Sequence, residues 1–416
     1  MRAVYARHTG DPDVAALFAD ALMNRTPWAL WDLASGSPAA GADTEEARQV
    51  LEAAMTNEGG TAHPGPLHIY IQLMEMSPTP EEALPAGDAL RDLVPDAEHL
   101  QHMPTHIDVL CGHYERFVTS NQAAIDADGL ALARDGAINF YSLYRCHNYH
   151  FKLYGAMFLG DSRRALEAGN EMAALLTTEL LSVEHPPMAD RLEGFVPMRL
   201  HVLIRFGLWE QIIATPFPDD RDLYCTTTAM LHYVRAVAYA VTDRVADAAT
   251  EAALFDTARA SVPDTRYVFN NTCQDILAIA GAMLRGELEY RRGNVEAGFA
   301  HLRRAVDPDD ALPYDEPWGW MQPTRHALGA LLLEQDRVEE ALGVYAADFG
   351  FDATLARPCQ HPDNVWSLAG IVECLTRLGR DTEVQMLEQR LALARARADV
   401  PVEFSCLCRR SAAEGR

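Results

Sequence analysis

Lysine is almost absent from this chain of 416 residues. Of its 35 basic residues, 34 are arginines, and the only lysine is Lys152. A Walker-type phosphate-binding loop requires a lysine after a glycine-rich segment, and a pyridoxal phosphate enzyme requires a lysine that forms a Schiff base with its cofactor. Lys152 does not follow a glycine-rich segment. The sequence therefore excludes protein kinases and Walker-type ATPases, and it argues against pyridoxal phosphate enzymes.

Long hydrophobic runs and closely spaced cysteines are also lacking. No stretch approaches the roughly 20 apolar residues of a membrane span, and the first residues, Met-Arg-Ala-Val-Tyr-Ala-Arg-His, lack the apolar core of a signal peptide. The eight cysteines are too sparse for a disulfide scaffold, and their scattered spacing is typical of reduced thiols. We therefore predict a cytoplasmic protein without a membrane partner.

Positive charge and several common catalytic motifs are scarce as well. The formal net charge of −25 repels phosphate backbones, and no basic face is visible, so we expect no nucleic-acid partner. The sequence contains no Gly-x-Ser-x-Gly motif, no His-Glu-x-x-His motif and no dinucleotide-binding fingerprint after a strand. Any enzymatic activity must therefore depend on other residues.

The sequence consists mainly of Ala/Leu/Arg/Glu-rich runs with helical periodicity, broken by short turns. Segments with the alternation of strands are few, which predicts an all-α protein. Similar turns recur along the chain, where a glycine or aspartate ends one helix shortly before the next begins. These turn residues are Gly112, Gly160, Gly207, Gly293, Asp336 and Gly379.

This arrangement resembles the tetratricopeptide repeat (TPR) family, in which a glycine closes the first helix, an aromatic residue follows, and alanines mark the packed face of the second helix. Phe117 and Ile212 depart from the pattern, since a small residue is expected at each position. The resemblance implies helical hairpins that form a right-handed superhelix (an α-solenoid) with a concave groove. The matching positions are Gly112 with Tyr114 and Ala124, Gly160 with Ala165, Gly293 with Ala305, and Asp336 with Ala341 and Tyr345.

We expect three regions along the chain. Residues 1–62 form a helical N-terminal segment, residues 63–395 form the TPR-like array, and residues 396–416 form a C-terminal tail. A helix is expected from Asp13 to Met23. If the array is divided, the Pro/Asp-rich stretch from Asp307 to Pro323 is the expected joint.

Three pairs of histidines are the main functional signal. Their first members are 39 and 45 residues apart and their second members 38 and 44, which is the scale of a helical hairpin repeat. In the first two pairs a proline between the histidines suits the first turn of a helix, so one histidine should lie at the helix start and its mate just inside. The pairs are His63 with His68, His102 with His106, and His147 with His150.

These motifs resemble those of a bacterial group of TPR-like proteins whose functions are largely unassigned. The segments concerned are His63-Pro-Gly-Pro-Leu-His68, His102-Met-Pro-Thr-His106 and His147-Asn-Tyr-His150. Members of that group commonly carry these histidines and a further histidine where this chain has Gln72. The resemblance covers most of the chain, but it implies no particular reaction.

Eight of the 15 histidines fall between residues 63 and 150, about a fifth of the chain. If stacked repeats bring the three pairs together, their neutral imidazoles form a transition-metal site. We predict the six paired histidines as ligands and rank copper first, then iron, then zinc, because histidine dominates over carboxylate and no thiolate lies within the motifs. Glu75 and Tyr70 are the predicted catalytic residues.

A simpler interpretation of the histidines is that they mark helix starts and bond to the backbone. His-Pro also occurs at His185 and His361, outside the cluster. His99 shares a helical face with His102 and His106 if the backbone is helical that far, and the sequence favours neither a ligand nor a structural role for it. His113 follows the turn glycine Gly112 and is expected to be solvated.

Three functions are compatible with this sequence. The first is a metal-dependent oxidase or oxygenase that acts on a small organic molecule in the groove. The second is a non-catalytic module that binds a peptide or protein in the groove, with structural histidines. The third, metal-assisted hydrolysis, differs from the first in the metal and its activated water.

Overall fold

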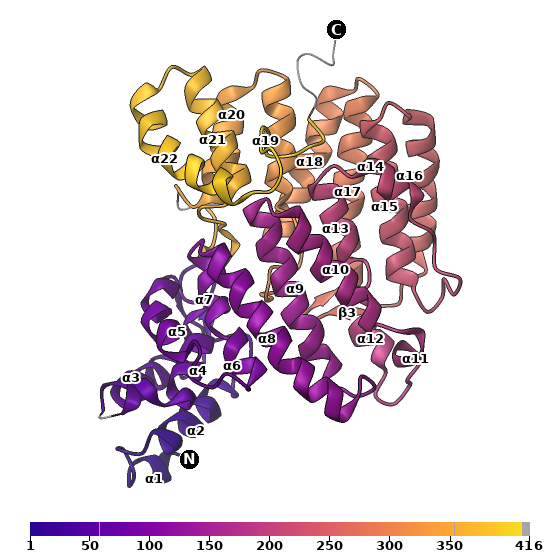
Figure 1. Cartoon of the computed structure of the whole chain (residues 1–416). Helices are drawn as coiled ribbons and strands as arrows, with labels where there is room; N and C mark the ends of the chain where they lie inside the picture. The colour runs from indigo at the N-terminus through magenta and orange to yellow at the C-terminus, as the bar shows by residue number, and fades with distance from the viewer. Residues whose placement is uncertain (58, 353, 410–416) are drawn as a thin grey trace. The chain divides into compact units, whose positions relative to one another are not determined.

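The computed structural model describes residues 1–57, 59–352 and 354–409, which form two compact units. About 66% of the chain is helical, and the described strands are only two residues long each, so the prediction of an all-α protein is confirmed. The first unit comprises residues 1–136 and 350–362, and the second comprises residues 137–349 and 363–416 (Figure 1). The last seven residues of the predicted tail lie outside the described part.

The helices of the first unit pack around α4 and α7. Helices α2, α3 and α4 pack against one another, α4 also contacts α5 and α7, and α8 packs on α6 and α7. This packing brings α4 and the α6–α7 segment together within one unit. Its elements are α1 Arg2–Tyr5, α2 Pro12–Met23, β1 Trp31–Asp32, β2 Ser37–Pro38, α3 Thr44–Thr56, η1 Gly60–Ala62, α4 Pro64–Met74, η2 Pro80–Ala83, α5 Leu84–Leu90, α6 Glu98–His102, α7 Pro104–Leu110, α8 Tyr114–Asp135 and η4 Arg357–Cys359.

Proline marks the start of several helices in this unit, as the sequence predicts. Pro64 is the first residue of α4 and Pro104 the first residue of α7. The missing N–H of proline is not needed at this position, and its backbone angle is already helical. His63 therefore precedes one helix and His102 ends the helix before the other, while their mates His68 and His106 lie just inside α4 and α7.

The second unit consists mainly of consecutive packed helices. Helix α9 packs on α10, α15 on α16, α17 on α18, α19 on α20, and α21 on both α20 and α22. Its elements are α9 Ser142–Leu159, α10 Ser162–Leu175, α11 Thr178–Leu181, α12 Met188–Leu192, η3 Glu193–Phe195, α13 Met198–Arg205, α14 Trp209–Ala214, α15 Cys225–Val241, α16 Val245–Ala260, β3 Tyr267–Val268, β4 Asn271–Thr272, α17 Cys273–Arg291, α18 Val295–Asp310, α19 Thr324–Glu334, α20 Val338–Phe349, α21 Val365–Arg377 and α22 Asp381–Arg397.

Each predicted turn residue separates two helices and has a left-handed backbone. A glycine adopts this conformation without strain, and aspartate tolerates it better than most residues. Asp243, which is not among the predicted turn residues, also separates two helices, α15 and α16, with a φ of 62°. The φ angles are 74° at Gly112, 76° at Gly160, 61° at Gly207, 85° at Gly293, 59° at Asp336 and 68° at Gly379.

The residues that fit the repeat pattern lie in the core. Ala124, Ala165, Ala305 and Ala341 are all completely buried. The two exceptions to the pattern, Phe117 and Ile212, are completely buried as well. A large side chain is therefore accommodated where the pattern expects a small one, because the neighbouring helices leave room for it.

The prediction that the chain divides between residues 307 and 323 is wrong. The chain passes from the first unit to the second after Gly136, and a short return segment, residues 350–362, belongs to the first unit. Helix α18 continues through Pro308 to Asp310. Composition alone indicated a break in a stretch that is packed within one unit.

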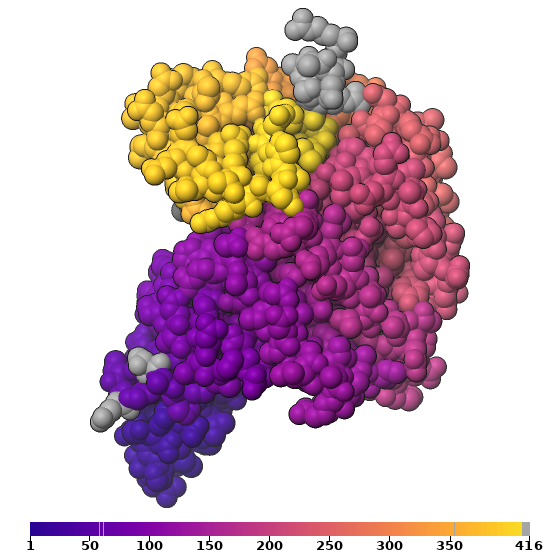
Figure 2. All heavy atoms as spheres, in the orientation of Figure 1, coloured from indigo at the N-terminus to yellow at the C-terminus, as the bar shows by residue number. Residues whose placement is uncertain are grey.

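The tail from residue 396 is packed against the second unit as far as it is described. Ser405 is buried, and its carbonyl accepts a hydrogen bond from Arg205 Nη1 at 2.8 Å. Cys406 and Cys408 are joined by a disulfide, which corrects the expectation of reduced thiols at these two positions. Helix α22 buries Leu387 and Leu391, and its outer face lies at the surface (yellow in Figure 2).

Two glycines enclose the ring of Tyr345 between neighbouring helices. A Cβ atom added at Gly329 of α19 would lie 2.4 Å from the ring, and one added at Gly370 of α21 would lie 2.5 Å from it. The ring itself is completely buried, and its hydroxyl is 2.5 Å from Ser405 Oγ. These close approaches require glycine at both positions, because the ring is held from several sides.

We expect Gly329→Ala to reduce the free energy of unfolding by about 1–3 kcal/mol, because the added methyl group overpacks the core against Tyr345. The matched control is Gly343→Ala in α20, where no atom lies within 4 Å of an added Cβ. That change should stabilise the protein by up to about 1 kcal/mol, since alanine favours a helix. Chemical denaturation measures both, and equal effects of the two substitutions would contradict the packing described here.

Candidate metal centre

Four histidines and one glutamate of the first unit form a continuous buried or part-buried row. Helix α4 carries His68 and is followed directly by Glu75, while α6 and α7 carry the remaining three histidines. Because α4 packs on α7 and α8 packs on both α6 and α7, the side chains of separate helices meet. We call this set the histidine row; its members are Glu75, His106, His102, His99 and His68.

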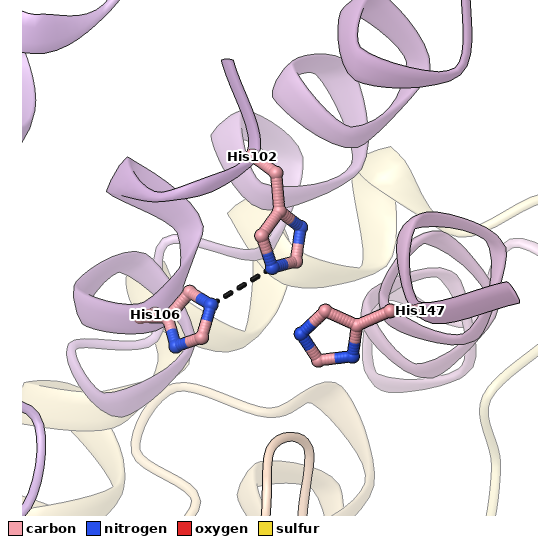
Figure 3. A group of neighbouring side chains, drawn as sticks. All are labelled: His102, His106 and His147. Atoms are coloured by element: carbon pink, nitrogen blue, oxygen red, sulfur yellow. Dashed lines mark hydrogen bonds between the residues drawn. The ribbon is translucent and has the colours of Figure 1, made fainter. Parts of the chain in front are cut away.

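The Nε2 atoms of the row face one another in two pairs. His102 Nε2 and His106 Nε2 are 2.8 Å apart (Figure 3), and their rings meet edge to face at 4.7 Å between centroids. His68 Nε2 and His99 Nε2 are 3.1 Å apart. The rings of His99 and His102 lie 6.3 Å apart and link the two pairs.

Asn121 of α8 determines which nitrogen of His102 carries a proton. The Asn121 amide nitrogen donates to the carbonyl oxygen of Phe117 at 2.9 Å, so its oxygen faces His102 Nδ1 at 2.7 Å. An amide oxygen can only accept, so His102 Nδ1 must donate. The Nε2 atom of His102 is therefore left with a lone pair that points to His106.

Glu75 orients His106 in the same way from the opposite end of the row. Its Oε2 atom lies 2.5 Å from His106 Nδ1, and both side chains are buried. Two lone pairs at 2.8 Å would repel each other, so His106 Nε2 donates to the lone pair of His102. Because His106 also donates from Nδ1 to Glu75, it is an imidazolium that forms an ion pair with the Glu75 carboxylate until a metal displaces the Nε2 proton. One hydrogen atom between His102 Nε2 and His106 Nε2 completes a hydrogen bond between the two rings. A metal ion could take the same position.

Burial keeps the imidazoles of His68 and His102 uncharged. It lowers the pKa of His68 to about 3, with smaller contributions from His99 and His106. Burial likewise lowers the pKa of His102 well below its ordinary value, and the neighbouring His106 and His99 act in the same direction. A neutral imidazole has the free lone pair that a metal requires, so these nitrogens are available as ligands at neutral pH.

The spacing of the nitrogens agrees with shared coordination. Two ligands at about 2.0–2.1 Å from one metal, with angles between about 90° and 109°, are separated by about 2.8–3.4 Å. The pair of His68 and His99 falls within this range at 3.1 Å, and the pair of His102 and His106 lies at its lower end at 2.8 Å. The described part of the chain thus contains histidine and glutamate groups that could hold a metal ion.

The contact between Glu75 and His106 is of a kind that is common at metal sites. A ligating histidine usually donates its other ring N–H to a carboxylate or carbonyl, which fixes the orientation of the ring. His106 donates through Nδ1 to Glu75, and His102 donates through Nδ1 to Asn121. Both rings therefore present Nε2 in a fixed direction.

Two predicted site residues have other contacts in the first unit. His63 caps α4, since its Nδ1 accepts from the backbone of Gly65 at 3.2 Å, and its Nε2 lies 3.4 Å from Asp13. This contact is the helix-start role of the simpler interpretation. The hydroxyl of Tyr70 contacts Glu52 of α3 at 3.2 Å, and burial raises its pKa to about 12. Tyr70 therefore remains a neutral phenol at physiological pH.

The third histidine pair belongs to the second unit. His147, also drawn in Figure 3, and His150 both lie in α9. The ring of His147 meets that of Phe269 at 4.6 Å, and His150 Nε2 lies 2.8 Å from Met321 Sδ. Their role as ligands of the predicted six-histidine site stays a prediction from the sequence.

The structure adds two residues to the set that the sequence predicted. His99 contacts His68, although its spacing relative to His102 and His106 was the only sign of it in the sequence. Asn121 lies 19 residues beyond His102, and nothing in the sequence pairs it with a histidine. Only the packing of α8 on α6 brings Asn121 to the row.

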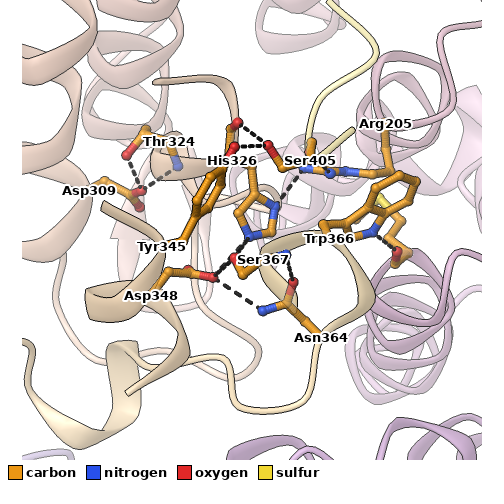
Figure 4. Close-up of polar contacts among 11 residues, drawn as sticks. Arg205, Asp309, Thr324, His326, Tyr345, Asp348, Asn364, Trp366, Ser367 and Ser405 are labelled. Carbon is orange, nitrogen blue, oxygen red and sulfur yellow. Dashed lines mark hydrogen bonds and ion pairs between the residues drawn. The ribbon is translucent and has the colours of Figure 1, made fainter. Parts of the chain in front are cut away.

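A second group of polar side chains, in the second unit, resembles a catalytic triad in composition only (Figure 4). Ser367 Oγ lies 2.9 Å from His326 Nε2 and donates to Asp348 Oδ2 at 2.5 Å. His326 Nε2 also lies 2.9 Å from the same carboxylate oxygen, and Arg205 donates to His326 Nδ1 at 3.1 Å. Ser367 is completely buried and its hydroxyl is bound to the carboxylate, so no substrate can reach it. This group is part of the core.

Comparison with known protein families and with characterised proteins found no match for the chain. The part of the chain that the structure describes contains no helix with the length and apolar character of a membrane span.

Proposed function

We propose that the histidine row binds a transition metal and that the protein is a metal-dependent oxidase or oxygenase for a small organic molecule. The observation that carries the proposal is the pairing of four Nε2 atoms at 2.8 and 3.1 Å. His68, His99, His102 and His106 would hold the metal through Nε2. Glu75 would orient His106 and accept its proton.

Nitrogen ligands without a thiolate favour a redox metal here. Imidazole suits copper, iron and zinc, and sets of histidines are the usual ligands where copper or iron reacts with dioxygen. We rank copper first, iron second and zinc third, as the sequence predicts. When bound, such a metal would supply electron transfer between the organic substrate and dioxygen.

The protein surroundings would contribute in two ways. Burial of His102 and His106 excludes water from the ligands, which strengthens electrostatic interactions inside the site. The Glu75 carboxylate, 2.5 Å from His106 Nδ1, is placed to hold a proton that leaves the row when the metal enters. Both features favour metal binding by the histidine row over a role at an exposed surface.

The test is metal analysis followed by oxygen uptake, on protein purified without a polyhistidine tag. We expect about one ion or more per chain after reconstitution with Cu²⁺ or Fe²⁺. The loaded protein should consume dioxygen with at least one member of a panel of phenols and amines, and the zinc-loaded protein should not. Less than about 0.2 ion per chain after reconstitution would refute the proposal. Activity of the zinc form on an ester panel would instead support the metal-assisted hydrolase.

A non-catalytic interaction module is the second candidate. It is supported by the repeated helix pairs of the second unit, whose left-handed turn residues include Gly160, Gly293 and Asp336. We propose, as the sequence resemblance implies, that these pairs belong to the TPR-like class and form a right-handed superhelix with a groove for a peptide. A stoichiometric peptide or protein partner whose affinity survives substitution of the histidine row would favour this function.

A further inference from the structure

Two buried histidines and a methionine lie near one another inside the second unit, and His150 contacts Met321 directly. His150 lies in α9 and His201 in α13, and these two helices pack against each other. The segment from Trp320 to Gln322 lies against both. Met321 Sδ is 2.8 Å from His150 Nε2, the ring of Trp320 is 5.0 Å from that of His201, and the Gln322 amide donates to the His201 carbonyl.

Both histidines offer nitrogens that the protein does not use. Within the described residues, neither His150 Nδ1 nor His201 Nδ1 has a hydrogen-bond partner. His150 is completely buried and His201 is 2% exposed. Burial lowers the pKa of each ring to about 3, and the proximity of His201 contributes to the shift at His150. A buried nitrogen without a partner is costly, so the arrangement calls for a ligand or a specific reason.

We propose that His150, His201 and Met321 form a binding site for a soft monovalent metal ion, Cu(I). The site lies wholly within the second unit and does not depend on the histidine row of the first. It differs from the role predicted from the sequence, in which His150 is a ligand of the six-histidine centre.

The chemistry of the three side chains selects the ion. A thioether is a soft ligand that favours Cu(I) over Zn²⁺ or Mg²⁺, and neutral imidazole binds Cu(I) as well. All three side chains are uncharged, and the surroundings are aromatic, with Phe195 at 5.3 Å from the ring of His150. Burying a divalent ion there without a carboxylate would be costly, and a monovalent ion reduces that cost.

A small pocket lies beside the segment that carries Met321. It has a volume of about 40 Å³, and its lining includes Trp320, Gln322 and Tyr233. Trp320 and Gln322 are the two neighbours of Met321 in the chain, and Trp320 packs on His201. The pocket has room for about two or three water molecules.

The test is anaerobic titration of the tag-free full chain with Cu(I) supplied as its bicinchoninate complex. The protein with His68→Ala and His106→Ala should still take up one Cu(I), because those residues belong to the other unit. Met321→Leu should weaken this binding at least about tenfold, and the volume-conserving change should leave the fold intact. Met172→Leu, at a completely buried methionine of α10, is the matched control and should bind as the parent does.

X-ray absorption at the copper edge gives an independent measure. We expect a sulfur neighbour at about 2.3 Å in the Cu(I)-loaded parent and its loss in Met321→Leu. A parent spectrum without this sulfur neighbour refutes the proposal even if the variant is unstable. A spectrum without sulfur, or unchanged Cu(I) affinity in Met321→Leu, would overturn the proposal and leave the contact of His150 with Met321 as a structural hydrogen bond.

Discussion

The combined substitutions His68→Ala and His106→Ala should lower bound Cu²⁺ or Fe²⁺ from about one ion per chain to below about 0.2. Each substitution removes one Nε2 atom from a pair, the first from the pair at 3.1 Å and the second from the pair at 2.8 Å. Neither pair can then hold a metal with two nitrogens. Elemental analysis of reconstituted, tag-free protein measures the effect, together with the loss of oxygen uptake.

The control for this experiment is His301→Ala in α18. His301 is partly exposed and contacts Arg304 in the same helix, so its removal should leave the metal content unchanged. Because His106→Ala also removes the partner of the buried Glu75, His106→Gln provides a second variant that keeps a polar group beside the carboxylate. Metal retained in a folded double variant would show that the ligands were assigned incorrectly.

Replacing Asp348 by alanine should reduce the free energy of unfolding by about 3–5 kcal/mol and lower the melting temperature by about 6–20 °C. Its Oδ2 atom accepts from Ser367, from His326 Nε2 and from Asn364 Nδ2 at 2.5, 2.9 and 3.2 Å. Burial lowers the pKa of Arg205 to about 9, and the charge of Asp348 partly offsets this effect. Without Asp348, the buried guanidinium of Arg205 loses a compensating negative charge, and the three donors lose their common hydrogen-bond acceptor.

Asp256→Ala is the matched control, because Asp256 is an exposed carboxylate in the middle of α16 that pairs with Arg285 at 2.5 Å. An exposed ion pair of this kind contributes about 1 kcal/mol or less. Thermal and chemical denaturation of both variants measure the difference. If the two substitutions destabilise the protein equally, the buried group of Figure 4 is not the stabilising element described here.

Local residue chemistry explains why much of the fold was predictable. The helix that begins at Pro12 and ends at Met23 was expected from Asp13 to Met23, and the left-handed turns at Gly112 and Gly379 separate helices as predicted. These features depend on backbone angles that a single residue type permits. The unit boundary after Gly136 was not predicted, because a boundary depends on which helices share a core.

The candidate site was predictable to a smaller extent. The proline after His63 and the proline before Thr105 indicate where two histidines enter helices, and both helices begin at those prolines. The sequence could not separate the capping role of His63 from a ligand role, since both use the same position. It also contained no sign that Asn121 orients His102.

The sequence by itself determined the helical class, the ends of the helices and the clustering of histidines near two helix starts, because these follow from propensities within a few residues. Only the tertiary structure decided which nitrogens face one another. His68 meets His99 across 31 residues, and His150 meets Met321 across 171. Such contacts arise from the packing of separate helices, and no spacing along the chain specifies the angle at which two helices pack.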